Sequence, residues 1–178
     1  MSSITFRIVE KFPEPAFSAL AELVFSDYEV SELLTDVANA EAAAIPRSAK
    51  VPEAESLRIG AFRGESLIGW AIARAEGSSH FDMINSGVAP DERRHGVYTE
   101  LVCMVIEHAR SRGYVAIRSR HAANNNAVIV AKLKLGFLVS GFEYSEVYGP
   151  LVRLTFLLGE LRRTLYRTRS SPIRRAKR

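Results

Sequence analysis

Residues 88–98 read Val88-Ala89-Pro90-Asp91-Glu92-Arg93-Arg94-His95-Gly96-Val97-Tyr98. The proline is expected to end a strand, a charged loop follows it, and a glycine opens a helix. The first turn of a helix leaves backbone N–H groups without partners, and the helix dipole adds positive potential there. Glycine lets a ligand approach the backbone closely, and the two arginines and the histidine add charge or donors. The pattern predicts an anion site suited to a pyrophosphate, although a plain strand–loop–helix connection has the same composition.

The segments on either side of this stretch show clear hydrophobic periodicity. Helix 97–112 is the strongest, because Val97, Leu101, Val105 and Ala109 recur every four residues. Three strands in succession before the stretch predict antiparallel pairing, whereas helix and strand alternate after it and predict some parallel pairing. A mixed sheet with helices on both faces follows. The expected strands are 5–9, 57–63, 67–75, 81–88, 114–121, 137–144 and 151–158, and the expected helices are 15–24, 31–37, 97–112 and 127–135, with a loop over 42–55.

Composition places the chain among ordinary globular proteins. It has 178 residues, of which 47% are hydrophobic and 25% charged, which suits one domain over 1–160. No apolar run is long enough for a membrane span, and the first residues do not resemble a secretory signal. The single cysteine, Cys103, fits a reducing compartment, so we expect a cytoplasmic protein. No Cys/His spacing indicates a metal site.

Charge is distributed unevenly along the chain. The net charge is +4, yet residues 151–178 contain nine Lys or Arg and one Glu. The last residues, 168–178, lack the apolar content needed to order themselves, so residues 161–178 are expected to form a flexible basic tail. Such a tail could contact nucleic acid or anionic lipid. The prediction favours a solvated terminus over a nucleic-acid contact.

Several short motifs together resemble the GCN5-related N-acetyltransferase (GNAT) superfamily. They are the V-x-P at 88–90, the R-x-x-G at 93–96, the N-N-N-A at 124–127 and the K-L-G-F at 134–137, in this order of elements. The resemblance implies an α/β fold with a mixed, mostly antiparallel central sheet and an acetyl-CoA co-substrate. It also implies that strands 81–88 and 114–121 splay apart to admit this molecule. The implied binding positions are Val88, Arg93, Arg94, His95, Gly96, Val97, Tyr98, Thr99 and Asn125.

Two positions depart from the family pattern. Tyr98 stands where a small residue usually completes the phosphate loop. Its ring could crowd the phosphates, or it could point sideways and donate its hydroxyl. Lys132 stands where many members have a tyrosine that protonates the leaving thiolate. A lysine ammonium could donate that proton or stabilise the thiolate by charge, or it could simply face solvent beside Lys134.

Two further residues are candidates for acid–base chemistry. Asp82 matches the place of the general base in the histone-acetylating branch, although it could simply accept a hydrogen bond. His121 ends a strand where it could face the cleft together with Ser119, or it could be structural. Arg118 and Arg120 would share the opposite face of that strand, where ion pairs with Asp or Glu are expected.

The resemblance implies an N-acetyltransferase that moves an acetyl group directly from acetyl-CoA to a primary amine of a small molecule or peptide. An acyl-CoA-binding module without turnover and a protein anchored by its basic tail are the alternatives. Substrate contacts are expected from 17–44 and 143–151. Glu143, Tyr144, Glu146 and Tyr148 would suit a cationic amine, or they form an ordinary polar hairpin. Homodimers are frequent in the family, so a homodimer remains open.

Overall fold

The computed structural model describes residues 3–26 and 54–170. The expected helix at 31–37 and most of the loop at 42–55 lie outside these residues. The other expected elements all form, with ends shifted by three residues or fewer. In chain order they are β1 (Ile4–Ile8), α1 (Ala16–Phe25), β2 (Ser56–Arg63), β3 (Ser66–Glu76), β4 (His80–Val88), the 3-10 turn η1 (Pro90–Glu92), α3 (Val97–Ser111), β5 (Ala116–Ala122), α4 (Asn126–Lys134), β6 (Leu138–Ser145), β7 (Gly149–Leu157) and α5 (Glu160–Ser170).

A single seven-stranded sheet runs through the molecule in the order β1-β2-β3-β4-β5-β7-β6. Strands β4 and β5 pair in parallel, and every other neighbouring pair is antiparallel. The mixed, mostly antiparallel sheet predicted from the sequence is therefore confirmed.

Hydrophobic side chains cover both faces of the β1–β4 half of the sheet. On one face α3 buries its periodic residues, including Val97, Leu101 and Val105, in the larger core. On the other face α1 packs over Trp70, which is fully buried beside Phe17 and Phe25. Strand β4, the last strand of this half, contacts both helices.

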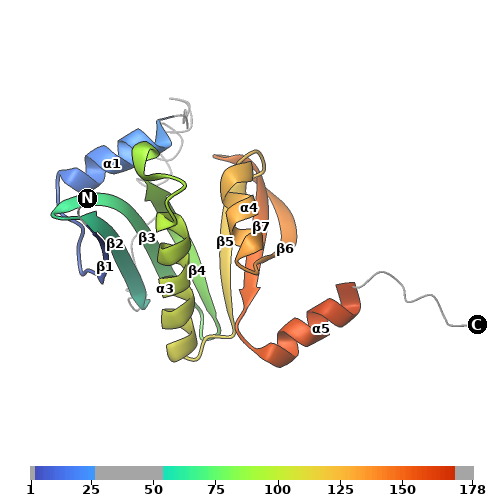
Figure 1. Ribbon diagram of the computed structural model, residues 1–178. Helices are drawn as coiled ribbons and strands as arrows, with labels where there is room; N and C mark the ends of the chain where they lie inside the picture. The colour runs from blue at the N-terminus through green and yellow to red at the C-terminus, as the bar shows by residue number, and fades with distance from the viewer. Residues whose placement is uncertain (1–2, 27–53, 171–178) are drawn as a thin grey trace, which may run out of the picture.

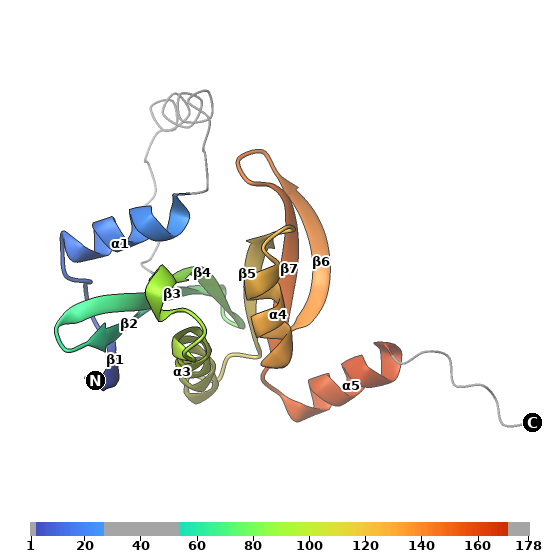
Figure 2. The ribbon, with the colours of Figure 1, turned by 45° about the horizontal axis from the view of Figure 1, so that its top comes forward.

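Strands β4 and β5 diverge along their length. Only residues 80–83 of β4 pair with β5, opposite residues 116–119, although β4 continues to Val88 and β5 to Ala122. Figures 1 and 2 both show the two ribbons separating in this direction. The sheet is therefore split into two halves at the end where the charged loop begins.

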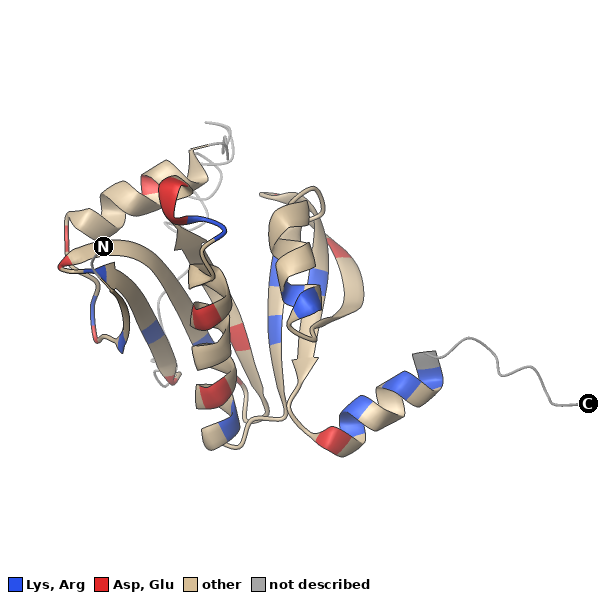
Figure 3. Cartoon of the chain, in the orientation of Figure 1, with Lys and Arg blue, Asp and Glu red and all other residues tan. Residues whose placement is uncertain are grey.

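The segment after β7 differs from the sequence prediction. Residues 160–170, expected to belong mostly to a flexible tail, form the helix α5. Leu, Arg and Glu are good helix formers, and Arg163 fixes the first turn by donating to the carbonyl of Leu157 (3.0 Å) and to the Glu160 carboxylate (3.1 Å). The blue segments of this helix in Figure 3 are its arginines. Over 3–26 and 54–170, no helix has the length and apolar character that crossing a membrane requires.

Candidate functional site

The charged loop adopts an open conformation at the start of α3. Gly96 has a φ of +82°, and Arg94 has a φ of 66°, the left-handed region that side chains other than glycine seldom adopt. A Cβ atom placed on Gly96 would meet no atom within 4 Å. The side chains of Arg93, Arg94 and His95 are exposed, as is Thr99 in the first helical turn. The loop thus presents unpaired first-turn N–H groups and basic side chains to open space.

Ion pairs and hydrogen bonds hold this loop in place. Arg63, at the end of β2, donates two hydrogen bonds to the Glu92 carboxylate, at 2.7 Å and 2.6 Å. Arg93 Nε donates to the carbonyl oxygen of Val88 at 3.2 Å. Val88 and Val97 are both buried in the core. The loop therefore has a fixed geometry before any ligand arrives.

Tyr98 points away from the loop. Its ring packs against the larger core, and its hydroxyl oxygen is buried without a hydrogen-bond partner among the described residues. Burial raises the pKa of Tyr98 to about 12, and the nearby Ser86 side chain partly opposes that shift. The ring does not crowd the loop, so the departure from the family pattern leaves the anion site open.

A cleft lies between the separated ends of β4 and β5. Its walls come from both halves of the sheet, from α4 and from the β6–β7 hairpin, so residues far apart in sequence meet there. The lining residues are Phe25, Met83, Ile84, Asn85, Ser86, Arg120, His121, Ala122, Asn125, Val128, Lys132, Glu143, Tyr144, Ser145, Tyr148 and Leu151. Three of the residues singled out in the sequence, His121, Asn125 and Lys132, thus share one cleft.

Lys132 lines this cleft with a completely buried side chain. Its exposed fraction is 0%, its Nζ donates to Met83 Sδ at 3.2 Å, and it lies 4.8 Å from the centre of the Phe137 ring. Burial lowers the pKa of Lys132 to about 7. The amine can therefore exchange a proton near neutral pH, as a general acid requires. It does not face solvent beside Lys134, which is exposed.

His121 and Asn125 complete the polar wall of the cleft on this side. His121 Nε2 lies 3.1 Å from Ser119 Oγ, as the alternation along β5 predicts. Burial, and secondarily the charge of Lys132, lower the pKa of His121 to about 3, so its ring is neutral at physiological pH. Asn125 caps α4 by accepting a hydrogen bond from the Val128 N–H at 3.3 Å.

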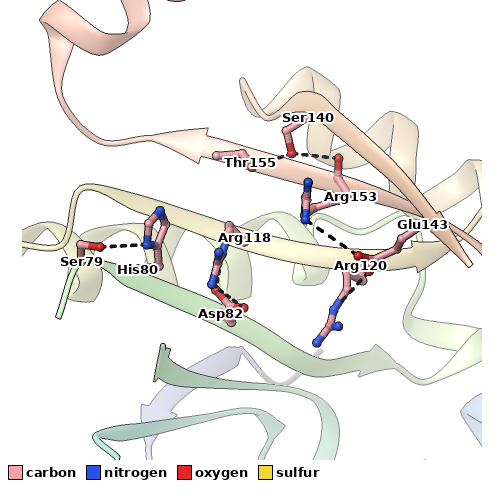
Figure 4. Close-up of polar contacts among 9 residues, drawn as sticks. All are labelled: Ser79, His80, Asp82, Arg118, Arg120, Ser140, Glu143, Arg153 and Thr155. Carbon is pink, nitrogen blue, oxygen red and sulfur yellow. Dashed lines mark hydrogen bonds and ion pairs between the residues drawn. The ribbon is translucent and has the colours of Figure 1, made fainter. Parts of the chain in front are cut away.

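Asp82 lies outside the lining of this cleft. Arg118 donates to its two carboxylate oxygens at 2.9 Å and 3.2 Å (Figure 4). Arg120 and Arg153 form longer ion pairs with Glu143. The expectation that Arg118 and Arg120 pair with acidic residues agrees with the structure. The Asp82 carboxylate is thus held by the Arg118 guanidinium and lies apart from the residues that line the cleft with Lys132.

The sequence also matches a known family model. The model for the acetyltransferase (GNAT) family matches residues 17–137, which include the loop, the cleft strands and α4. The chain belongs to the GNAT acetyltransferase family. No curated protein sequence matches this GNAT chain significantly.

Solved GNAT structures share the fold at low sequence identity. The Escherichia coli ribosomal-protein-S18-alanine N-acetyltransferase is 17% identical, with a TM-score of 0.65 over 89% of this chain and 97% of that one. Aminoglycoside 6'-acetyltransferase type Ii is 16% identical, with a TM-score of 0.63 over 87% and 97%. A GNAT acetyltransferase from Elizabethkingia anophelis with acetyl-CoA bound is 16% identical, with a TM-score of 0.60 over 87% and 98%. These likenesses establish the fold.

Sequence reasoning missed some residues of this GNAT site. Asn85 and Ser86 line the cleft because β4 outlasts its pairing with β5, and no local signal in the sequence marks where a strand loses its neighbour. Met83 contacts Lys132 across 49 positions of the chain. Only the folded topology brings these two residues together.

Proposed function

We propose that this chain transfers an acetyl group directly from acetyl-CoA to a primary amine of a small molecule or peptide. The observation that supports this most is that β4 connects the two parts of the site: its unpaired residues 84–86 line the cleft that contains Lys132, and its last residue, Val88, is followed by the open loop at Gly96. An anion site and a polar cleft in this arrangement suit a long molecule with a phosphate end and a reactive end. The solved relative with acetyl-CoA bound shares this fold.

The residues of the loop fit a pyrophosphate. The backbone N–H groups at the start of α3 would donate to it, and Arg93, Arg94 and His95 would supply charge. The open space around Gly96 leaves room for the phosphate oxygens, and Tyr98 is turned into the core. The Arg63–Glu92 pair keeps the loop in this shape, so little ordering would be needed on binding.

The unpaired end of β4 would bind the middle of the same molecule. Beyond Met83 the strand has no neighbouring strand on its β5 side within the described residues, so N–H and C=O groups of residues 84–87 are available on that side, whereas the Val88 carbonyl accepts from Arg93. Asn125, at the start of α4, lines the opposite wall. Amide groups of an extended ligand would pair with these groups as a neighbouring strand does.

The acetyl thioester supplies an activated acyl group, and the chain's own residues would manage charge and protons around it. Lys132, in its protonated form, would donate a proton to the leaving sulfur or stabilise it by charge. The neutral His121 ring, fixed by Ser119, would hydrogen-bond to groups near the reacting carbon. Asp82, clasped by Arg118, has no role in this mechanism.

Calorimetric titration with acetyl-CoA, followed by a thiol-release assay with an amine panel, tests the proposal. We expect micromolar binding, about −8 kcal/mol, and turnover with at least one amine. Lys132→Ala should retain binding and lose most turnover. The control Lys134→Ala, at an exposed position of the same helix, should retain both. Binding without turnover by any amine would instead identify a non-catalytic acyl-CoA-binding module. The absence of binding would refute the proposal altogether.

A further inference from the structure

Glu143 occupies the side of the cleft farther from α3. It lies opposite Leu151 on β7, and Leu151 lies opposite Ala122, the residue after His121. Its side chain is 30% exposed, and it is the one carboxylate among the described residues that line the cleft. A positively charged group entering the cleft from this side would therefore meet Glu143.

The Glu143 carboxylate is incompletely satisfied by the protein. Arg120 Nε lies 3.6 Å from Glu143 Oε1, and Arg153 Nη1 lies 3.8 Å from Oε2. Both distances suit an ion pair but exceed those of a hydrogen bond. Oε1 is shielded from solvent and accepts no hydrogen bond within the described part of the chain. The partly exposed Glu143 carboxylate therefore keeps the capacity to accept from a further donor.

Arg120 offers the complementary group at the same place. Its side chain is 60% exposed, and a guanidinium has five N–H donors suited to a carboxylate. Neighbouring Arg118 on β5 is already engaged by Asp82, whereas Arg120 extends beside Glu143 (Figure 4). The cleft thus presents one cation and one anion side by side, with the exposed rings of Tyr144 and Tyr148 nearby.

We infer that the acceptor is a free amino acid, whose ammonium group binds Glu143 and whose carboxylate binds Arg120. Because Arg120 Nε and Glu143 Oε1 lie 3.6 Å apart, a ligand whose two charges are a few bonds apart, as in an α- or β-amino acid, would match this pair. The tyrosine rings would contact the ligand's side chain. This inference rests on the proposed function, because it identifies the amine that the proposed transfer would use.

Matched ligand pairs test the inference by binding alone. The probes are L-phenylalanine with phenethylamine and L-leucine with isoamylamine, which differ only in the carboxylate. Affinities are measured by calorimetry with the full chain saturated with CoA. The variants are Arg120→Gln, Glu143→Gln and the control Arg74→Gln, an exposed arginine on β3 that lies outside the cleft lining.

In the wild type, at least one amino acid should bind about tenfold or more tightly than its decarboxylated partner, the effect of one charge-assisted hydrogen bond. Arg120→Gln should abolish this preference and leave amine affinity nearly unchanged. Glu143→Gln should weaken the binding of both members of the pair. The control Arg74→Gln should change the affinity for neither member. Equal binding of both members, a preference that survives Arg120→Gln, or no binding of any probe would overturn the inference. A separate titration of each protein with CoA alone reports on the proposed function.

Discussion

Replacing Lys132 with methionine should stabilise the protein while removing its function. Methionine keeps the apolar stem and much of the volume of lysine, and its flexible side chain fills irregular spaces. It also removes an amine that is completely buried and whose described contacts are a thioether sulfur and an aromatic ring. Above about pH 7 this amine is mostly neutral in the folded chain, whereas in the unfolded chain it stays protonated up to its ordinary pKa of 10.5.

The magnitude follows from the two pKa values. Burial lowers the pKa of Lys132 from 10.5 to about 7, and each pH unit between the two values is worth about 1.4 kcal/mol. In that interval the unfolded chain binds a proton that the folded chain lacks, so wild-type stability rises with pH between 7 and 10.5. The stabilisation by Lys132→Met should therefore be about 4 kcal/mol at pH 7 and about 2 kcal/mol at pH 9.

Urea unfolding of both proteins at several pH values between 7 and 9.5 measures this difference. Groups other than Lys132 titrate in both proteins and largely cancel in the subtraction. Lys134→Met, on an exposed position of α4, should show no comparable pH-dependent gain. A stability difference for Lys132→Met that stays constant across this pH range would refute the reasoning, because it would mean that the buried amine does not titrate as its burial requires.

Three other perturbations test separate parts of the structure. The His121 ring, whose pKa is lowered to about 3, should show no chemical-shift titration between pH 5 and 8 in NMR spectra, and a midpoint near 6.5 would contradict its burial. Gly96→Ala should reduce the free energy of unfolding by about 1–2 kcal/mol, because a residue with a Cβ is strained at a φ of +82°. The new methyl group should also weaken acetyl-CoA binding in calorimetry, and an unchanged affinity would count against the loop as the anion site. Trp70→Phe should cost about 1–3 kcal/mol in urea unfolding, because it leaves space around a fully buried side chain and removes the hydrogen bond to Asn85 Oδ1 at 2.8 Å. No loss would mean that the indole is not important for stability.

The fold was largely predictable because its signals are local. The four-residue spacing in 97–112 marks α3, and strands β2 and β3 are separated by a turn at Gly64. Helix α5 was missed because its charge density resembles that of a solvated terminus. Its order depends on Arg163 reaching back to Leu157 and Glu160, a contact that composition alone does not reveal.

The candidate site was predictable in position but only partly in chemistry. Spacing from Asn125 located Lys132, yet its burial depends on Met83 and Phe137, which come from β4 and from the residue before β6. Asp82 has the right distance from the loop in sequence. Its pairing with Arg118 on the neighbouring strand, however, removes it from the cleft. Cross-strand partners of this kind follow from register, which residue spacing along one strand does not specify.

The electrostatics of the cleft link stability to the proposed chemistry. Burial that makes Lys132 costly also lowers its pKa to about 7, so a loss in folding free energy produces an acid that titrates near neutral pH. The same burial, together with the charge of Lys132, keeps His121 neutral, so His121 and Lys132 are not both protonated near neutral pH. A developing negative charge on a leaving sulfur would favour protonation of Lys132, the group better able to accept a proton. In the proposed mechanism Lys132 would be protonated most readily when negative charge develops on the sulfur, and the folded state carries the cost of burying the amine throughout.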